Sequence, residues 1–126
     1  MSGFGGIKVL IVEDEGFVAL LIENMLQDLG CEIVASVAGL KEASTVAAAE
    51  EIDLAVLDIN LGGERSFPVA EVLRERGVPF LFSTGYGSAG LPAEFSGCQV
   101  LGKPFSAKAL EEALRRALGC HPDPTA

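Results

Sequence analysis

Apolar positions along the chain fall into short continuous runs separated by longer stretches with helical spacing. The short runs are rich in Val, Ile, Leu and Phe, and they lie at residues 7–12, 32–37, 53–58, 78–83 and 98–101. Continuous apolar runs of this length are typical of strands that are buried on both faces of a sheet. The pattern therefore predicts five strands.

Between these runs, apolar residues recur every three or four positions, which predicts amphipathic helices. One helix carries an apolar face that comprises Val18, Leu21, Ile22, Met25, Leu26 and Leu29. It ends at Gly30, and an Ala-rich helix follows at about 40–50. A third helix has Pro68 in its first turn and runs to about Arg76. Ser106 caps a last helix with Leu110, Ala113, Leu114, Ala117 and Leu118 on one face.

Glycine and proline interrupt the pattern in two places. Residues 61–64 predict a loop, and residues 85–97 hold four glycines and Pro92, so any helix there is short. Neither an internal repeat nor a linker divides the chain. Strands that alternate with helices imply one doubly wound α/β domain, with a parallel sheet covered on both faces.

Polar residues follow most of the predicted strands directly. In folds of this class, ligands bind beyond the carboxyl ends of the strands, so we expect these side chains to gather at one edge. The first, third, fourth and fifth strands are followed by, in order, Glu13 and Asp14, Asp58, Ser83 and Thr84, and Lys103. The edge would therefore combine three carboxylates with hydroxyls and one ammonium group.

These groups have the chemistry needed for phosphoryl transfer to a carboxylate. Crowded carboxylates repel one another unless a cation intervenes, and Mg²⁺ suits a site of a few carboxylates plus phosphate oxygens. An Asp carboxylate can act as the nucleophile toward phosphorus. A metal, a lysine and a hydroxyl then neutralise the transferred charge. The residues themselves therefore point to Asp58 as a phosphoryl acceptor.

Four short motifs carry a family resemblance. They are Val-Glu-Asp-Glu at 12–15, Leu-Asp-Ile-Asn-Leu at 57–61, Ser-Thr-Gly at 83–85 and Lys-Pro-Phe at 103–105. Together and in this order, they resemble the signature of two-component response-regulator receiver domains. The resemblance implies a flavodoxin-like five-stranded parallel sheet of order 2-1-3-4-5, with about five flanking helices. It places the domain at 7–118, an N-terminal extension at 1–6 and a tail at 119–126.

The resemblance assigns metal binding to four residues. Asp58 becomes the phosphoacceptor and a ligand of Mg²⁺, and Glu13 and Asp14 form the acidic pair. Asp14 is expected to be the more direct ligand. The backbone carbonyl of Asn60 is expected to complete the protein's contribution.

The same resemblance assigns the phosphoryl contacts and raises a question about the switch. Thr84 and Lys103 would contact phosphoryl oxygens, and a cis peptide would join Lys103 to Pro104. Many receivers carry an aromatic switch residue where this chain has Val100, so the usual aromatic readout is missing. We expect Tyr86, two residues beyond Thr84, to carry part of the signal.

A narrower resemblance involves residues 79–87, Pro-Phe-Leu-Phe-Ser-Thr-Gly-Tyr-Gly. This segment is similar to the Phe-Ala-Thr-Gly-x-Tyr motif of an alphaproteobacterial subfamily of receivers that often stand alone. Gly62, where most receivers carry Pro, belongs with this subfamily, and Ser83 replaces its usual Ala. The resemblance implies a histidine kinase of the HWE or a related family, or a phosphotransfer protein, as phosphoryl donor. It also implies a downstream protein partner. For Phe17, the sequence leaves two roles open, a place in the core or a contact with the kinase.

Composition bears on the protein's partners, its location and the state of its cysteines. The net charge of −9 argues against a nucleic-acid surface, which needs clustered Lys and Arg. No apolar run reaches the roughly 18 residues of a membrane span, and the start lacks a signal peptide, so we expect a cytoplasmic protein without a membrane partner. Three cysteines without C-x-x-C spacing predict reduced thiols. No output domain follows the last predicted helix, which favours signalling through protein contacts.

Two other functions fit parts of the pattern. A pseudo-receiver would bind a partner without phosphorylation, but the complete set of acidic pair, Asp58, Thr84 and Lys103 argues against it. A flavin-binding protein or an Asp-nucleophile phosphatase would need a phosphate loop after the first strand or a second Asp where Asn60 stands. We expect no enzyme activity beyond the protein's own phosphorylation and dephosphorylation.

Overall fold

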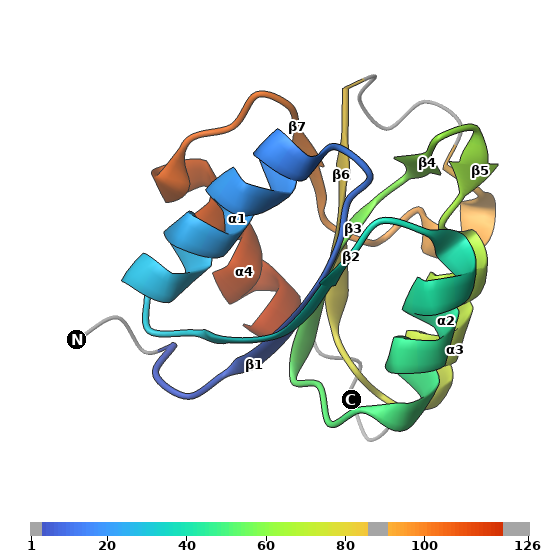
Figure 1. Ribbon diagram of the computed structural model, residues 1–126, viewed down its shortest axis with the longest axis horizontal. Helices are drawn as coiled ribbons and strands as arrows, with labels where there is room; N and C mark the ends of the chain where they lie inside the picture. The colour runs from blue at the N-terminus through green and yellow to red at the C-terminus, as the bar shows by residue number, and fades with distance from the viewer. Residues whose placement is uncertain (1–3, 86–90, 120–126) are drawn as a thin grey trace.

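A computed structural model, which describes residues 4–85 and 91–119, shows a central parallel sheet of five strands. The strands are β1 (Lys8–Val12), β2 (Glu32–Val37), β3 (Leu54–Asp58), β6 (Phe80–Thr84) and β7 (Val100–Gly102). Their order in the sheet is β2-β1-β3-β6-β7 (Figure 1). Because β4 and β5 lie outside this sheet, β6 and β7 are its fourth and fifth strands. The expected doubly wound order 2-1-3-4-5 is confirmed.

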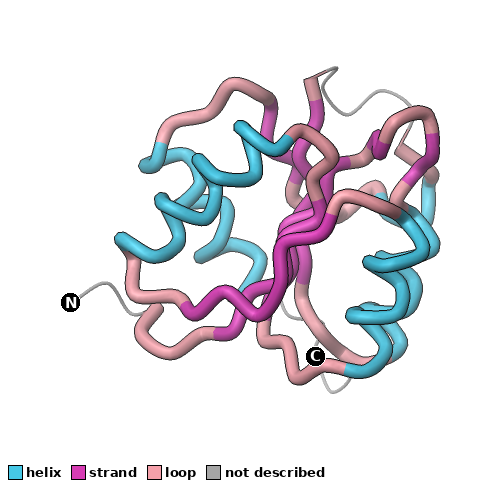
Figure 2. Tube along the Cα trace, viewed as in Figure 1, coloured by secondary structure: helices cyan, strands magenta, loops and turns pink. Residues whose placement is uncertain are grey.

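Two layers of helices cover the sheet. One face carries α1 (Gly16–Asp28) and α4 (Ala107–Gly119), and the other carries α2 (Leu40–Ala49) and α3 (Phe67–Glu75) (Figures 1 and 2). About five helices were expected. In the described ranges there are four α-helices and one 3-10 turn, η1 (Ala93–Phe95), which lies in the glycine-rich stretch where any helix was expected to be short.

The sheet separates two apolar cores, which explains the unbroken apolar runs of the sequence. Successive residues of a strand point to opposite faces. Val56 and Leu81 accordingly pack in the core beneath α1 and α4, whereas Leu57 and Phe82 pack in the core beneath α2 and α3. Every residue of β3 is buried. The polar residue that ends this strand, Asp58, is therefore held by a rigid support.

The loop predicted at 61–64 is a tight hairpin. β4 (Asn60–Leu61) pairs antiparallel with β5 (Glu64–Arg65), and the turn between them is Gly62-Gly63. Both glycines have positive φ, 62° and 99°, as a two-residue type I′ turn requires. The sequence predicted only a loop here, because the two strands are too short to show a pattern of their own.

Ring packing anchors η1. Five ring pairs among Phe67, Phe80, Phe82 and Phe95 have centroids 5.5 to 6.1 Å apart. The guanidinium of Arg74 lies 4.4 Å from the centre of the fully buried Phe95 ring. This apolar cluster fixes η1 against α3 and β6, although the surrounding sequence has little helix propensity.

The two ends of the domain are held by different contacts. Phe4, in the expected N-terminal extension, is buried in the core beneath α1 and α4, and the Arg115 guanidinium lies 5.0 Å from its ring centre. At the other end, Ser106 Oγ accepts a hydrogen bond from Ala109 N–H at 3.0 Å, which confirms the predicted cap of α4. Residues 120–126 of the expected tail lie outside the described residues.

Three further expectations concern Leu21, the cysteines and membrane-spanning helices. Leu21, assigned to the apolar face of the first helix, is 43% exposed, so that assignment is wrong; the helix turns Ala19, Ile22 and Leu26 inward instead. Within the described part of the chain, Cys31 and Cys98 are free thiols. No helix described there is long and apolar enough to cross a membrane.

Candidate functional site

The predicted site residues meet at the carboxyl edge of the sheet because the strands are in register. Glu13, Asp58 and Lys103 each lie two positions beyond a residue of the core beneath α1 and α4, namely Ile11, Val56 and Leu101. Side chains two positions apart share a face of a strand, so the three polar groups continue one apolar row. Asp14 and Thr84 follow the strand residues that point to the opposite face of the sheet. Their side chains therefore approach the site from the face that α2 and α3 cover.

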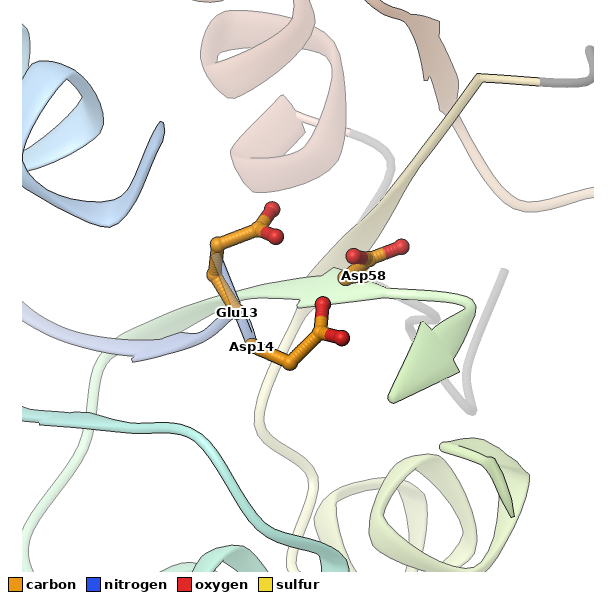
Figure 3. Close-up of side chains that lie close together, drawn as sticks. All are labelled: Glu13, Asp14 and Asp58. Atoms are coloured by element: carbon orange, nitrogen blue, oxygen red, sulfur yellow. The ribbon is translucent and has the colours of Figure 1, made fainter. Parts of the chain in front are cut away.

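Three carboxylates converge at this edge. Glu13, Asp14 and Asp58 each offer an oxygen, and the three oxygens lie within 4.8 Å of one another. Figure 3 shows the three side chains directed toward a shared space, with Glu13 and Asp14 coming from the end of β1 and Asp58 from the end of β3. Glu13 and Asp58 are only 2% and 5% exposed, whereas Asp14 is exposed.

The Lys103 ammonium joins two of these carboxylates. Its Nζ lies 2.8 Å from Glu13 Oε1 and 3.0 Å from Asp58 Oδ2. The contact with Asp58 is a hydrogen bond, and the contact with Glu13 is an ion pair without a well-directed hydrogen bond. The Lys103–Pro104 peptide is cis, as the resemblance implied. Lys103 therefore contacts Asp58, the predicted phosphoacceptor, as expected.

Burial and charge act in opposite directions on Glu13 and Lys103. Burial raises the pKa of Glu13 to about 7, although Lys103 and the Glu15 N–H both favour its charged form. Burial lowers the pKa of Lys103, but the adjacent Glu13 and Asp58 carboxylates outweigh it, and the pKa is raised. The site thus keeps a positive charge beside Asp58, together with more negative charge than one lysine can balance.

Backbone groups of the hairpin hold Asp58 from the other side. The Asn60 N–H donates to Asp58 Oδ1 at 3.2 Å. In a strand, the N–H and C=O of one residue point to the same side, so we expect the Asn60 carbonyl to face the site as well. The Asn60 side chain accepts a hydrogen bond from Gly63 N–H at 2.8 Å, which supports the turn. The role of the Asn60 carbonyl as a metal ligand stays a prediction.

An open hollow of about 300 Å³ lies over these groups. Its lining comprises Asp14, Glu15, Asp58, Asn60, Gly62, Thr84, Gly85 and Lys103. Thr84, which ends β6, is 4% exposed and borders this space. The hollow therefore brings together the predicted nucleophile, hydroxyl and ammonium with Asp14 of the acidic pair, whereas Glu13 is not among its lining residues.

The three residues predicted to form the switch differ in where they lie relative to the hollow. Val100 pairs with Phe82 across β6 and β7 and packs against the core beneath α2 and α3, outside the lining of the hollow. Tyr86 lies outside the described residues. Of the three residues expected to form the switch, Thr84 alone borders the hollow in the part of the chain that the structure describes.

The donor set fits Mg²⁺. A hard cation prefers oxygen ligands, and Mg²⁺ is commonly held by one or two carboxylates together with waters and phosphate oxygens. Asp14 is exposed, and it lines the hollow together with the buried Asp58 and with Asn60. The clustered carboxylates carry charge that Lys103 does not neutralise. Asp14, Asp58 and Asn60 would therefore hold the ion, with Glu13 behind them.

Sequence reasoning missed one contact beside the site and left the place of one aromatic residue open. The Glu15 N–H donates to Glu13 Oε2 at 3.1 Å and orients the buried carboxyl, a backbone contact that no residue type reveals. Phe17, left open between core and partner contact, is 73% exposed on the first turn of α1. Leu20 and Leu21 on the same helix are exposed as well.

Comparison with known proteins agrees with this geometry. Residues 9–115 match a family model described as the response regulator receiver domain. SdrG from Sphingomonas melonis Fr1 has a similar structure, with a TM-score of 0.81 at 38% identity over 90% of this chain and 97% of that chain. The receiver domain of sensor histidine kinase PA1611 from Pseudomonas aeruginosa PAO1, solved with a magnesium ion in its active-site cleft, gives 0.78 at 27% identity, covering 91% and 99%.

Curated relatives are longer than this chain. A probable transcriptional regulator, ycf27 of Cyanophora paradoxa, is 31% identical over 122 residues, which is 94% of this chain and 51% of that protein. The chain thus spans about half the length of the curated relatives it matches.

Proposed function

We propose, because the chain belongs to the response regulator receiver domain family, that it accepts a phosphoryl group on Asp58 with the help of Mg²⁺ and signals through protein contacts. One observation carries this proposal. The buried Asp58 carboxylate opens into the hollow and contacts Lys103 on one oxygen and the Asn60 N–H on the other. It is therefore fixed in orientation and flanked by a cation.

The reaction follows from these contacts. One oxygen of Asp58 attacks the phosphorus, and the O–P bond forms while the bond from phosphorus to the donor atom breaks, with its electron pair leaving on the donor. Lys103 and the Thr84 hydroxyl would meet the charge on the phosphoryl oxygens. Mg²⁺, held by Asp14, Asp58 and the Asn60 carbonyl, would supply further neutralisation of that charge. The protein contributes positioning and electrostatics.

Dependence on Mg²⁺ tests the proposal. Incubated with acetyl phosphate and Mg²⁺, the protein should gain the mass of one phosphoryl group, and chelation of the metal should prevent the gain. Asp14→Asn should raise the Mg²⁺ concentration needed for half-maximal phosphorylation about tenfold, because it removes one charged ligand. Intact mass spectrometry over a Mg²⁺ titration measures both effects. A protein that stays unmodified with acetyl phosphate and with every kinase tried is a pseudo-receiver.

The phosphoryl donor that we propose is a phosphohistidine on a histidine kinase, of the HWE or a related family, or on a phosphotransfer protein. To transfer its phosphoryl group, such a donor must reach the hollow. The donor protein therefore covers the surface around the hollow. α1 begins directly after Asp14 and Glu15, which line the hollow. The exposed Phe17 and Leu20 on this helix give the border an apolar surface. Exposed apolar side chains beside a polar site are typical of interfaces.

Phe17→Glu should slow phosphorylation by a histidine kinase that phosphorylates the wild type, by about tenfold or more, because the change puts a charge into the covered surface. Phosphorylation by acetyl phosphate should be unchanged, since a small donor needs no interface. The two rates can be followed by radiolabel transfer and by intact mass. Ala48→Glu, at an exposed position of α2 on the opposite helical layer, is the control and should alter neither rate. Equal kinase-dependent rates for Phe17→Glu and wild type would exclude this face.

A further inference from the structure

A fourth polar residue belongs to the row that Glu13, Asp58 and Lys103 form. Ser83 lies two positions beyond Leu81, which packs in the core beneath α1 and α4. Its register partners are Asp58 on β3 and Leu101 on β7. By strand alternation, the Ser83 side chain is therefore on the face that carries the Asp58 carboxylate, one strand away from it.

The Ser83 hydroxyl is buried without a partner. The residue has no exposed surface, and its Oγ has no hydrogen-bond partner among the described residues. A buried hydroxyl that loses its bonds to water and gains none in return destabilises the protein. Alanine would fill nearly the same space without this penalty. A role in another state of the site would account for the hydroxyl.

Lys103 provides the second half of the argument. It follows β7, yet its ammonium contacts Asp58 at the end of β3, and β6 lies between these two strands. The lysine side chain must therefore cross the end of β6 on the face that Ser83 occupies. Its ammonium has three N–H donors, and two of its partners are Glu13 and Asp58.

We propose that Ser83 is a positioning residue for phosphoryl transfer to Asp58, an inference that rests on the proposed function. In the free protein, Glu13 and Asp58 contact the Lys103 ammonium, and the Ser83 hydroxyl does not bind it. Once a phosphoryl group is on Asp58, the negative charge moves outward onto its oxygens, and the ammonium follows. A rotation about one bond lets Ser83 Oγ accept the N–H that Asp58 gives up. No bond other than hydrogen bonds changes in this step.

Ser83→Ala tests the inference. At saturating Mg²⁺ and acetyl phosphate, the variant should be phosphorylated about tenfold more slowly, the expected effect of one hydrogen bond to a charged group. The free variant should melt at a temperature no lower than wild type, because no hydrogen bond is lost. The rise in melting temperature on adding Mg²⁺ and beryllium fluoride, which mimics the phosphoryl group, should be smaller than in wild type. A purely structural serine would give the opposite pattern, with a lower melting temperature and an unchanged rise.

Ser66→Ala is the matched control. Ser66 is equally buried, and its Oγ also lacks a hydrogen-bond partner in the described ranges, but it directly precedes α3 and lies outside the row that Ser83 shares with Glu13, Asp58 and Lys103. This variant should keep the wild-type rate and the wild-type rise in melting temperature. If wild type is phosphorylated and Ser83→Ala matches it in rate, or if the free variant melts lower, the inference is overturned while the proposed function stands. If wild type takes up no phosphoryl group, the proposed function itself fails.

Discussion

Asp58→Asn should retain the fold and lose all phosphorylation, from small donors and from kinases alike. The amide has nearly the shape of the carboxylate but no charged oxygen to attack phosphorus. The surrounding structure has other partners: Lys103 keeps its ion pair with Glu13, and the amide oxygen can still accept the Asn60 N–H. Intact mass after incubation with acetyl phosphate and Mg²⁺ measures the loss, and circular dichroism checks the fold.

Asp53→Asn is the control for this result. Asp53 directly precedes β3, whereas Asp58 ends it, and its carboxylate accepts a hydrogen bond from Lys8 N–H at 2.9 Å at the opposite edge of the sheet. Its exposed side chain is far along the strand from the hollow, so the variant should be phosphorylated as wild type. A phosphoryl adduct that persists in Asp58→Asn would place the acceptor elsewhere in the chain.

Lys103→Met should reduce the rate of phosphorylation by acetyl phosphate by about 100-fold or more, the usual effect of removing one preorganised group that meets transition-state charge. Methionine keeps an unbranched, apolar side chain across the end of β6 but brings no ammonium to Asp58 Oδ2. The fold should survive, because Mg²⁺ can still neutralise the carboxylates. The rate is measured by intact mass over time at saturating Mg²⁺.

Lys108→Met, at an exposed position of α4, controls for the change in net charge and should leave the rate unchanged. Equal rates for wild type and Lys103→Met would mean that the ammonium balances the buried carboxylates without taking part in the transfer.

Strand periodicity predicted most of the site. Parallel strands that end at the same edge bring their following residues together, and this alone places Asp58 near Glu13, Asp14 and Lys103. The row arises because each polar residue continues the alternation of a buried strand. The strand starts were less accurate, since the apolar runs at 78–83 and 98–101 begin two residues before β6 and β7. Apolar residues in the preceding turns also pack into the core.

Other features depend on tertiary contacts that no local pattern records. Leu21 has helical spacing like its neighbours, yet it is exposed, because the first helix lies on the sheet with a narrower apolar face than its sequence offers. The raised pKa of Glu13 follows from burial under the helical layer. Likewise, the unpartnered hydroxyl of Ser83 emerges only when burial and hydrogen bonds are known together. Residue type indicates candidate chemistry, and packing decides its environment.

The most direct test of Asp58 as the acceptor is chemical trapping. Wild-type protein is incubated with acetyl phosphate and Mg²⁺ and then treated with borohydride, which reduces an aspartyl phosphate to homoserine. Peptide mass spectrometry locates the change. We expect homoserine at position 58, absent when Mg²⁺ is chelated. Homoserine at another carboxylate, or none in a protein that has gained the mass of a phosphoryl group, would contradict the assignment of Asp58.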